Sequence, residues 1–279
     1  MELFISDLDG TLLNSGAELS DFTRNTLNRL ISEKNMNFTV ATARTYASAG
    51  KILKGLDLKY PVVLMNGVLI YDPQSEKYAV VNKLESKIKA HIISEIRKCG
   101  LSAFMYTVSE NQMMTYYEEL ANKQMQDFYD ERRKKYYKSF EQTADFGSVN
   151  SDVIYFTIID KKDRLAPLYN FLRDCKGISI TYYNDVYSED MWYLEIFSDK
   201  ASKRNGVKYL RERYGFDKIT AFGDNTNDLP MFEVSDESIV VSNANQAVLS
   251  QCDHIIASNE EDGVAKYLDE YFSKITEDD

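Results

Sequence analysis

The chain has 279 residues, a formal net charge of −11, 44% hydrophobic residues and 28% charged residues, which predicts a folded protein of about two domains. This acidic balance argues against nucleic acid and anionic membranes as partners, because both bind basic surfaces. The N-terminal stretch "MELFISD" lacks the basic start of a secretory signal, and no apolar run reaches the roughly 18 residues of a membrane span, so we expect a cytoplasmic protein.

The first 82 residues alternate predicted strands and helices. Apolar runs predict strands at residues 3–6, 37–44 and 61–67. Between them, helical spacing of apolar residues predicts helices at 20–35 and 46–56. Segments 68–72 and 77–82 then resemble a hairpin. Because strand, helix and strand follow one another, we expect parallel pairing with right-handed crossovers.

After Asn82 the pattern changes to a tyrosine-rich mixture of strands and helices. We expect these elements in chain order: a helix at 84–100, strands at 101–108 and 112–119, a long helix at 118–140, a strand at 152–159, a helix, and strands at 178–184 and 192–197. From Lys203 the alternating pattern returns with a helix to Gly215, strands at 218–223 and 238–242, and two further helices. We therefore predict an α/β fold: a Rossmann-like parallel sheet core, residues 1–82 and 192–279, with an inserted α+β cap domain, residues 83–191.

Acidic side chains follow two of the predicted parallel strands. Asp7 and Asp9 end the strand "LFIS", and Asp224 and Asp228 follow "KITAFG". One such fragment is commonly turn chemistry, but two at the carboxyl ends of parallel strands predict a ligand site. Carboxylates about 4 Å apart repel by about 4 kcal/mol at an effective dielectric of 20, and a bound dication removes that repulsion. Oxygen ligands without histidine or cysteine favour Mg²⁺.

The order of four motifs resembles the haloacid dehalogenase superfamily. These motifs are "DLDGT" at 7–11, "ATAR" at 41–44, a lysine at 203 before a helix, and "GDNTND" at 223–228. Three further segments resemble its Cof-type sugar-phosphatase branch, whose cap is inserted between the second and third motifs: "MNG" at 65–67, "SNA" at 242–244 and "EDGVAKYL" at 261–268. The motifs lie between residues 4 and 268, whereas the cap resembles the family only in its position in the chain and its mixture of strands and helices.

This resemblance implies the chemistry of the two acidic loops. Asp7 would be the nucleophile that forms an aspartyl phosphate, and Asp9 the acid that protonates the leaving alcohol and then deprotonates water. Mg²⁺ would be held by the Asp7 side chain, the Asp9 backbone carbonyl and the Asp224 side chain. Asp228 would support these ligands without binding the metal itself. A carboxylate nucleophile suits phosphate monoesters, whose uncatalysed hydrolysis is among the slowest reactions.

The remaining motifs would hold the phosphoryl group, which needs hydrogen-bond donors and cations. The resemblance implies that role for Leu8, Thr42, Ala43, Lys203 and Asn227. Thr42 would offer its hydroxyl and its backbone amide. Lys200 and Asn225 are the rivals of Lys203 and Asn227, and Arg44 would contact the phosphate or the leaving group or form a surface salt bridge. Ala43 stands where the family usually has glycine, and Arg204 where it often has glycine.

These residues predict a Mg²⁺-dependent phosphatase that acts on a small phosphorylated metabolite. The alternatives are a phosphomutase with the same chemistry, a receiver-like regulatory domain and a non-catalytic binding module. Sugar phosphates, pyridoxal phosphate and flavin mononucleotide all remain candidate substrates, since specificity is expected in the cap. Tyr182, Tyr183 and Tyr187 are the cap residues expected to contact the leaving group. Nothing in the sequence indicates the oligomeric state.

Overall fold

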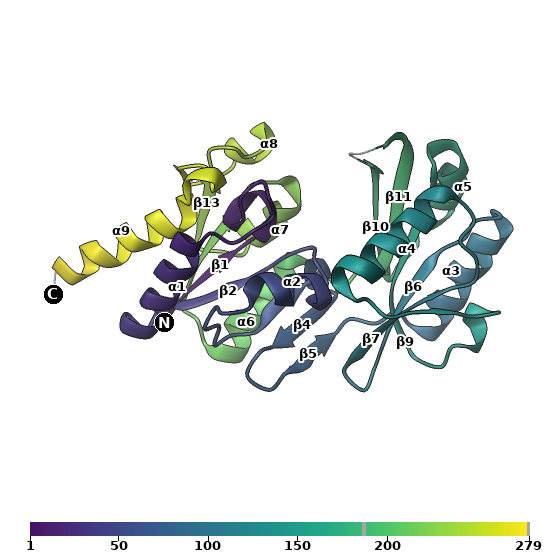
Figure 1. Ribbon diagram of the computed structural model, residues 1–279, viewed down its shortest axis with the longest axis horizontal. Helices are drawn as coiled ribbons and strands as arrows, with labels where there is room; N and C mark the ends of the chain where they lie inside the picture. Colours follow the sequence, from purple (N-terminus) through teal and green to yellow (C-terminus); the bar gives the residue numbers. More distant parts are fainter. Residues whose placement is uncertain (186–187, 278–279) are drawn as a thin grey trace. The chain divides into compact units, whose positions relative to one another are not determined.

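The computed structural model describes residues 1–185 and 188–277 (Figure 1). It contains two compact units: Met1–Val80 with Ser202–Asp279, which we call the core unit, and Val81–Ala201, which we call the cap unit. The cap unit is thus inserted into the core unit, and the expected α/β fold with a parallel core sheet and an α+β insertion is confirmed. Within the described residues, no helix has the length and apolar character needed to cross a membrane.

A parallel sheet with strand order β14-β13-β12-β1-β2 forms the centre of the core unit. β1 pairs with β12 on one side and β2 on the other, so that Ile5 lies opposite Ala221 and Thr39. A parallel bridge from Ala41 to Val63 brings β3 beside β2, and β3 pairs antiparallel with β4 in a second sheet that ends at β5. The strands are β1 (Glu2–Ser6), β2 (Asn37–Val40), β3 (Val62–Leu64), β4 (Leu69–Asp72), β5 (Lys77–Val81), β12 (Lys218–Gly223), β13 (Glu237–Val241) and β14 (His254–Ile256).

Helices of the core unit pack on the central sheet and on each other. On α9, the rings of Tyr271 and Tyr267 lie 5.4 and 5.7 Å from those of Phe4 and Phe222, so α9 covers the face to which these two residues point. α1 packs beside α9 (Figure 1). Side chains alternate along a strand, so Asp7 points to the opposite face from Phe4. The helices are α1 (Asp21–Glu33), α2 (Tyr46–Leu53), α6 (Lys203–Tyr214), α7 (Leu229–Phe232), α8 (Gln246–Leu249) and α9 (Gly263–Glu277).

The cap unit is a six-stranded sheet with strand order β10-β11-β9-β6-β7-β8 and three helices. One face buries an aliphatic cluster that includes Ile92 and Ile96 of α3, Leu165 and Leu168 of α5, and Leu194 of β11. On the other face, α4 stacks the ring of Phe128 on Phe104 at 4.9 Å. The elements are α3 (Ser86–Lys98), β6 (Phe104–Ser109), β7 (Gln112–Tyr117), α4 (Lys123–Tyr136), β8 (Phe140–Gln142), β9 (Asp152–Lys161), α5 (Lys162–Leu172), β10 (Ile178–Asp185) and β11 (Ser188–Ser198).

Several boundaries differ from the sequence-based expectation, among them the second edge of the cap and the ends of α4. Residues 192–201, expected in the core, belong to the cap unit, because β11 pairs with β9 as far as Phe197. α4 is shorter than the expected 118–140. It begins after Asn122, whose side chain accepts a hydrogen bond from the Met125 amide, and it ends at Tyr137, which has a left-handed φ of 52°.

Candidate active site

Asp7 directly follows β1 at the carboxyl edge of the central sheet. Its amide donates to the carbonyl of Phe222 on β12 at 2.9 Å, which holds the residue in the line of the sheet. The residue is only 5% exposed. Because β12, β1 and β2 are adjacent and parallel, the segments that follow them, with Asp224, Asp7 and Thr42, emerge at one edge of the sheet. This is the edge at which ligands bind in open α/β sheets.

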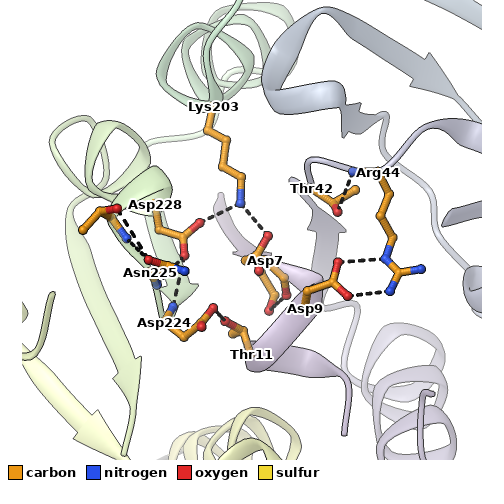
Figure 2. A network of polar contacts seen from close by, with 11 residues as sticks. Asp7, Asp9, Thr11, Thr42, Arg44, Lys203, Asp224, Asn225 and Asp228 are labelled. Carbon is orange, nitrogen blue, oxygen red and sulfur yellow. Dashed lines mark hydrogen bonds and ion pairs between the residues drawn. The ribbon is translucent and has the colours of Figure 1, made fainter. Parts of the chain in front are cut away.

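Lys203 joins Asp7 to Asp228 in a buried ion cluster (Figure 2). Its Nζ lies 2.5 Å from Asp7 Oδ1 and 2.6 Å from Asp228 Oδ1, and its side chain is 1% exposed. Its rival Lys200 is exposed. Burial alone would lower the pKa of Lys203, but the two carboxylates raise it above its usual value, so the amine keeps its charge. The structure therefore favours Lys203 over Lys200 as the cation of this site.

Asp228 organises the loop that follows β12. Its Oδ1 binds Lys203, while its Oδ2 accepts hydrogen bonds from the amides of Asp224 at 3.0 Å and Asn225 at 3.1 Å (Figure 2). The residue is fully buried. Both carboxylate oxygens thus accept from positively charged or polarised groups of the protein. This fits a role in holding Lys203 and the loop in place and not in direct contact with a ligand.

Asp224 is held from the other side by the turn that follows Asp7. Thr11 Oγ1 donates to Asp224 Oδ1 at 2.8 Å (Figure 2). Gly10 has a φ of +78°, and a Cβ there would lie 2.5 Å from Asp224 Oδ2, so only glycine allows this approach. Thr11 was not among the expected site residues, although it lies within the "DLDGT" motif. The signal was present, but its partner was not visible in the sequence.

The Asp9 carboxylate forms a two-point ion pair with Arg44. Arg44 Nε lies 2.7 Å from Asp9 Oδ2 and Nη2 lies 2.5 Å from Asp9 Oδ1 (Figure 2). Arg44 Nη1 also donates to Ser48 Oγ on α2 at 3.1 Å. The Asp9 side chain is 50% exposed, in contrast to buried Asp7. Arg44 therefore fixes the direction of the Asp9 carboxylate. A salt bridge was one of the two roles expected for Arg44, but the sequence did not identify Asp9 as its partner.

The other expected phosphate contacts differ in what they can offer. The Thr42 amide was expected to bind the phosphate, but it donates to Val63 O at 2.9 Å and is therefore not available to a ligand. The Thr42 hydroxyl accepts a hydrogen bond from the Arg44 amide at 3.1 Å. Ala43 and Asn227 are exposed, whereas the side chain of Leu8 is fully buried. Asn225 uses its Oδ1 to accept from the Thr226 amide at 2.8 Å, as the cap of the turn Thr226–Asp228. Asn225 is exposed as well, and this bond uses its carbonyl oxygen and not its NH₂ group, so both asparagines remain candidate donors to a phosphate.

Three carboxylates converge closely enough to hold a cation. One oxygen each of Asp7, Asp224 and Asp228 lies within 4.8 Å of the others. Burial raises the pKa of Asp224 to about 6, with Asp228 adding to the rise and Thr11 opposing it. Burial also raises the pKa of Asp7, Lys203 opposes that rise and Asp228 adds to it. Buried acidic oxygens whose charged forms are disfavoured fit a hard divalent cation such as Mg²⁺, with Asp7 and Asp224 as the accessible ligands.

We expect Asp228→Asn to destabilise the core unit strongly. The asparagine must turn its NH₂ group either toward the Lys203 ammonium or toward the amides of Asp224 and Asn225, so a donor faces a donor in either orientation. Breaking one partner of a buried ion pair costs about 3–5 kcal/mol, which urea unfolding would measure. Asp236→Asn is the matched control, since Asp236 also accepts from a backbone amide and an arginine but its side chain is 40% exposed. Equal losses for the two variants would contradict this account of Asp228.

Curated relatives match nearly the whole chain. The chain is 25% identical over 277 residues to a 5-amino-6-(5-phospho-D-ribitylamino)uracil phosphatase of Bacillus subtilis, with 97% of each protein covered. It is also 25% identical to the phosphatase YwpJ of the same organism, covering 96% of this chain and 99% of that protein. The similarity therefore extends over nearly the full length of both relatives.

Solved structures share the fold. A haloacid dehalogenase-like hydrolase from Bacteroides thetaiotaomicron superposes with a TM-score of 0.79 at 23% identity, covering 97% of this chain and 99% of that one. A crystal structure from Thermotoga maritima gives the same TM-score at 24% identity and covers 96% of each chain. A family model described as haloacid dehalogenase-like hydrolase matches residues 4–268. The chain belongs to the haloacid dehalogenase-like hydrolase family, as a member of its phosphatases.

Proposed function

We propose that this protein is a Mg²⁺-dependent phosphatase that hydrolyses a small phosphate monoester through an aspartyl phosphate on Asp7. The observation that carries this proposal is the buried carboxylate of Asp7, held by the charged amine of Lys203 at the carboxyl edge of the sheet, with Asp224 converging on it. The fixed amine supports an orienting and charge-stabilising role on a transferring phosphoryl group.

In the proposed reaction, a carboxylate oxygen of Asp7 forms a bond to phosphorus while the bond from phosphorus to the leaving alcohol breaks. Asp9 gives its proton to the leaving oxygen. In the second step, Asp9 takes a proton from a water molecule that attacks phosphorus, and the bond to Asp7 breaks to release inorganic phosphate. Arg44 positions Asp9 in this structure through both carboxylate oxygens, so one of these two contacts must open before that oxygen can carry the proton for the leaving alcohol and later accept one from water.

Asp7, Asp224 and the Asp9 backbone carbonyl would hold Mg²⁺, which when bound neutralises charge on the carboxylates and the phosphoryl group. Lys203 supplies a second positive charge next to Asp7. Thr42 contributes a hydroxyl, and Ala43 and Asn227, both exposed, can donate from the amide and the side chain respectively. Each of these contacts would stabilise negative charge on the phosphoryl oxygens.

A screen of phosphate monoesters with Mg²⁺ tests the proposed function. The panel holds sugar phosphates, pyridoxal phosphate, flavin mononucleotide and the phosphorylated ribitylaminouracil for which the Bacillus relative is named. We expect phosphate release from at least one ester without a bisphosphate activator, which separates a phosphatase from a phosphomutase. Asp7→Asn should abolish turnover, because an amide is a poor nucleophile at phosphorus. Turnover retained in that variant would contradict the assignment of Asp7.

Mg²⁺ should stabilise the protein more at neutral than at acidic pH. The raised pKa values of Asp7 and Asp224 mean that the metal-free folded state favours the protonated carboxyls. This contribution is present at low pH and is lost as pH rises through a pKa of about 6 for Asp224 and of about 7 for Asp7. A cation binds the ionised forms and reverses this preference. We therefore expect Mg²⁺ to raise the melting temperature more at about pH 7.5 than at about pH 5.

Asp224→Asn should reduce that Mg²⁺-dependent increase in the melting temperature. Asp217→Asn is its control, since the Asp217 carboxylate is 86% exposed and pairs with the N-terminus instead. The increase should survive in the control. An equal increase at both pH values, or one unaffected by Asp224→Asn, would contradict the metal site.

We propose that the cap unit selects the leaving group through the face of its sheet that carries Tyr106, Tyr155, Tyr183 and Tyr193. Of the expected contacts, Tyr183 is 45% exposed and stacks on Tyr193 at 5.4 Å. Tyr182 instead packs between Tyr169 and Trp192, and its hydroxyl donates to a backbone carbonyl. Tyr187 lies outside the described residues. Tyr183 is therefore the better candidate for contact with a substrate.

Replacing Tyr183 with alanine should change kcat/KM unequally among substrates. A bulky ester should lose about tenfold more than acetyl phosphate, because only the bulky leaving group extends to a cap residue. Phe171→Ala is the matched control. Phe171 is a 63% exposed ring of the same unit, on α5, which packs against the aliphatic face of the sheet. If Tyr183→Ala lowers kcat/KM by the same factor for both substrates, Tyr183 does not contribute to substrate selection.

A further inference from the structure

The turn Met65–Gly67, which carries the "MNG" motif, has an unusual backbone. Met65, Asn66 and Gly67 have φ values of 50°, 51° and 93°, so all of them lie in the left-handed region. That region is disfavoured for L-residues other than glycine, and a long side chain such as methionine rarely adopts it. Such a backbone persists only where its surroundings impose it, and it is concentrated at functional sites.

Two hydrogen bonds fix this turn to the loop that follows β2. The Met65 amide donates to Arg44 O at 3.0 Å, and the Asn66 amide donates to Thr42 O at 3.0 Å. Both partners belong to the "ATAR" motif, whose Thr42 and Arg44 side chains face the site (Figure 2). These bonds therefore fix the position of the turn relative to the loop.

Gly67 connects this turn to the start of α6. A Cβ on Gly67 would lie 2.3 Å from the carbonyl oxygen of Ser202 and 2.8 Å from its backbone nitrogen, so the two backbones touch directly. Ser202 caps α6 by accepting a hydrogen bond from the Asn205 amide at 3.0 Å, and Lys203 follows it immediately. A shift at this contact would move the residue next to Lys203.

A second close contact lies one turn along the same helix. A Cβ on Gly206 would approach Cγ1 of Val63 on β3 to 2.6 Å. Val63 also accepts the hydrogen bond from the Thr42 amide. The first turn of α6 thus rests on β3 and on the turn that follows it.

We propose that the turn Met65–Gly67 is the positioning element that sets the Lys203 amine relative to the Thr42 loop. Gly67 is the positioning residue, because it alone lets the turn abut the Ser202 peptide. The proposal rests on the proposed function, in which Lys203 and Thr42 both bind one phosphoryl group. Two segments that are far apart in the sequence then share one rigid support.

Gly67→Ala, compared with Gly215→Ala, tests this positioning role. Gly215 ends the same helix with a φ of +70°, but a Cβ there meets nothing within 4 Å, so both variants strain a left-handed backbone and only Gly67→Ala displaces Ser202. We expect Gly67→Ala to weaken inorganic phosphate binding and to lower kcat/KM by about 10- to 100-fold, as small misplacements of binding groups do. Mg²⁺ affinity should change less than phosphate affinity, because the carboxylates come from other segments and depend on Lys203 only through its contacts with Asp7 and Asp228. Gly215→Ala should retain all three quantities.

Two outcomes would overturn the positioning role. In one, Gly67→Ala lowers the phosphate and Mg²⁺ affinities by the same factor. In the other, Gly67→Ala binds phosphate as tightly as Gly215→Ala does. A wild-type protein that neither binds phosphate nor hydrolyses any ester would instead overturn the proposed function. If Gly67→Ala does not fold, hydrogen exchange in the wild-type protein decides. The Met65 and Asn66 amides should exchange as slowly as those of β3, whereas exchange as fast as in an exposed loop would overturn the proposal.

Discussion

Lys203 carries an ammonium group into the interior of the core unit, and the rest of the site is built around it. Moving a charge out of water costs several kcal/mol unless partners compensate for the lost hydration. Here the partners are the carboxylates of Asp7 and Asp228, at 2.5 and 2.6 Å. The three residues come from the end of β1, the start of α6 and the loop after β12. One interaction therefore ties together segments that the inserted cap unit separates in the sequence.

The charge of this cluster explains why an acidic protein can favour an anionic substrate. Asp7, Asp224 and Asp228 contribute three negative charges when ionised and Lys203 contributes one positive charge, which leaves a formal charge of 1 − 3 = −2. A divalent cation matches that excess. With the cation in place, the site would no longer repel a phosphate, and Lys203 and the Thr42 hydroxyl could then act as local donors. The metal and the lysine thus have complementary roles.

The sequence predicted the parts of the site that depend on strand order. Asp7 and Asp224 follow adjacent parallel strands, and a parallel sheet brings such ends together whatever the intervening chain does. It did not predict the partners of groups that meet through tertiary packing. The Thr42 amide bonds to β3, Arg44 pairs with Asp9, and Thr11 bonds to Asp224.

The sequence was also less informative where two elements of the same type follow one another. The strand at 192–197 is apolar enough for either unit, and its pairing with β9 and β10 assigns it to the cap. The left-handed turn at Met65 is a further case, because methionine carries no local preference for that backbone. Its cause lies in its contacts with the Thr42 loop and with Ser202, which only the folded chain brings together.

The central claim is that Asp7 takes the phosphoryl group from the substrate. The most direct measurement is to quench a single turnover in acid, digest the protein and locate the phosphoryl group by peptide mass. The account predicts that the peptide containing Asp7 gains one phosphoryl group during turnover, and that the same peptide of Asp7→Asn does not. A phosphoryl group found on another residue, or steady turnover by Asp7→Asn, would contradict it.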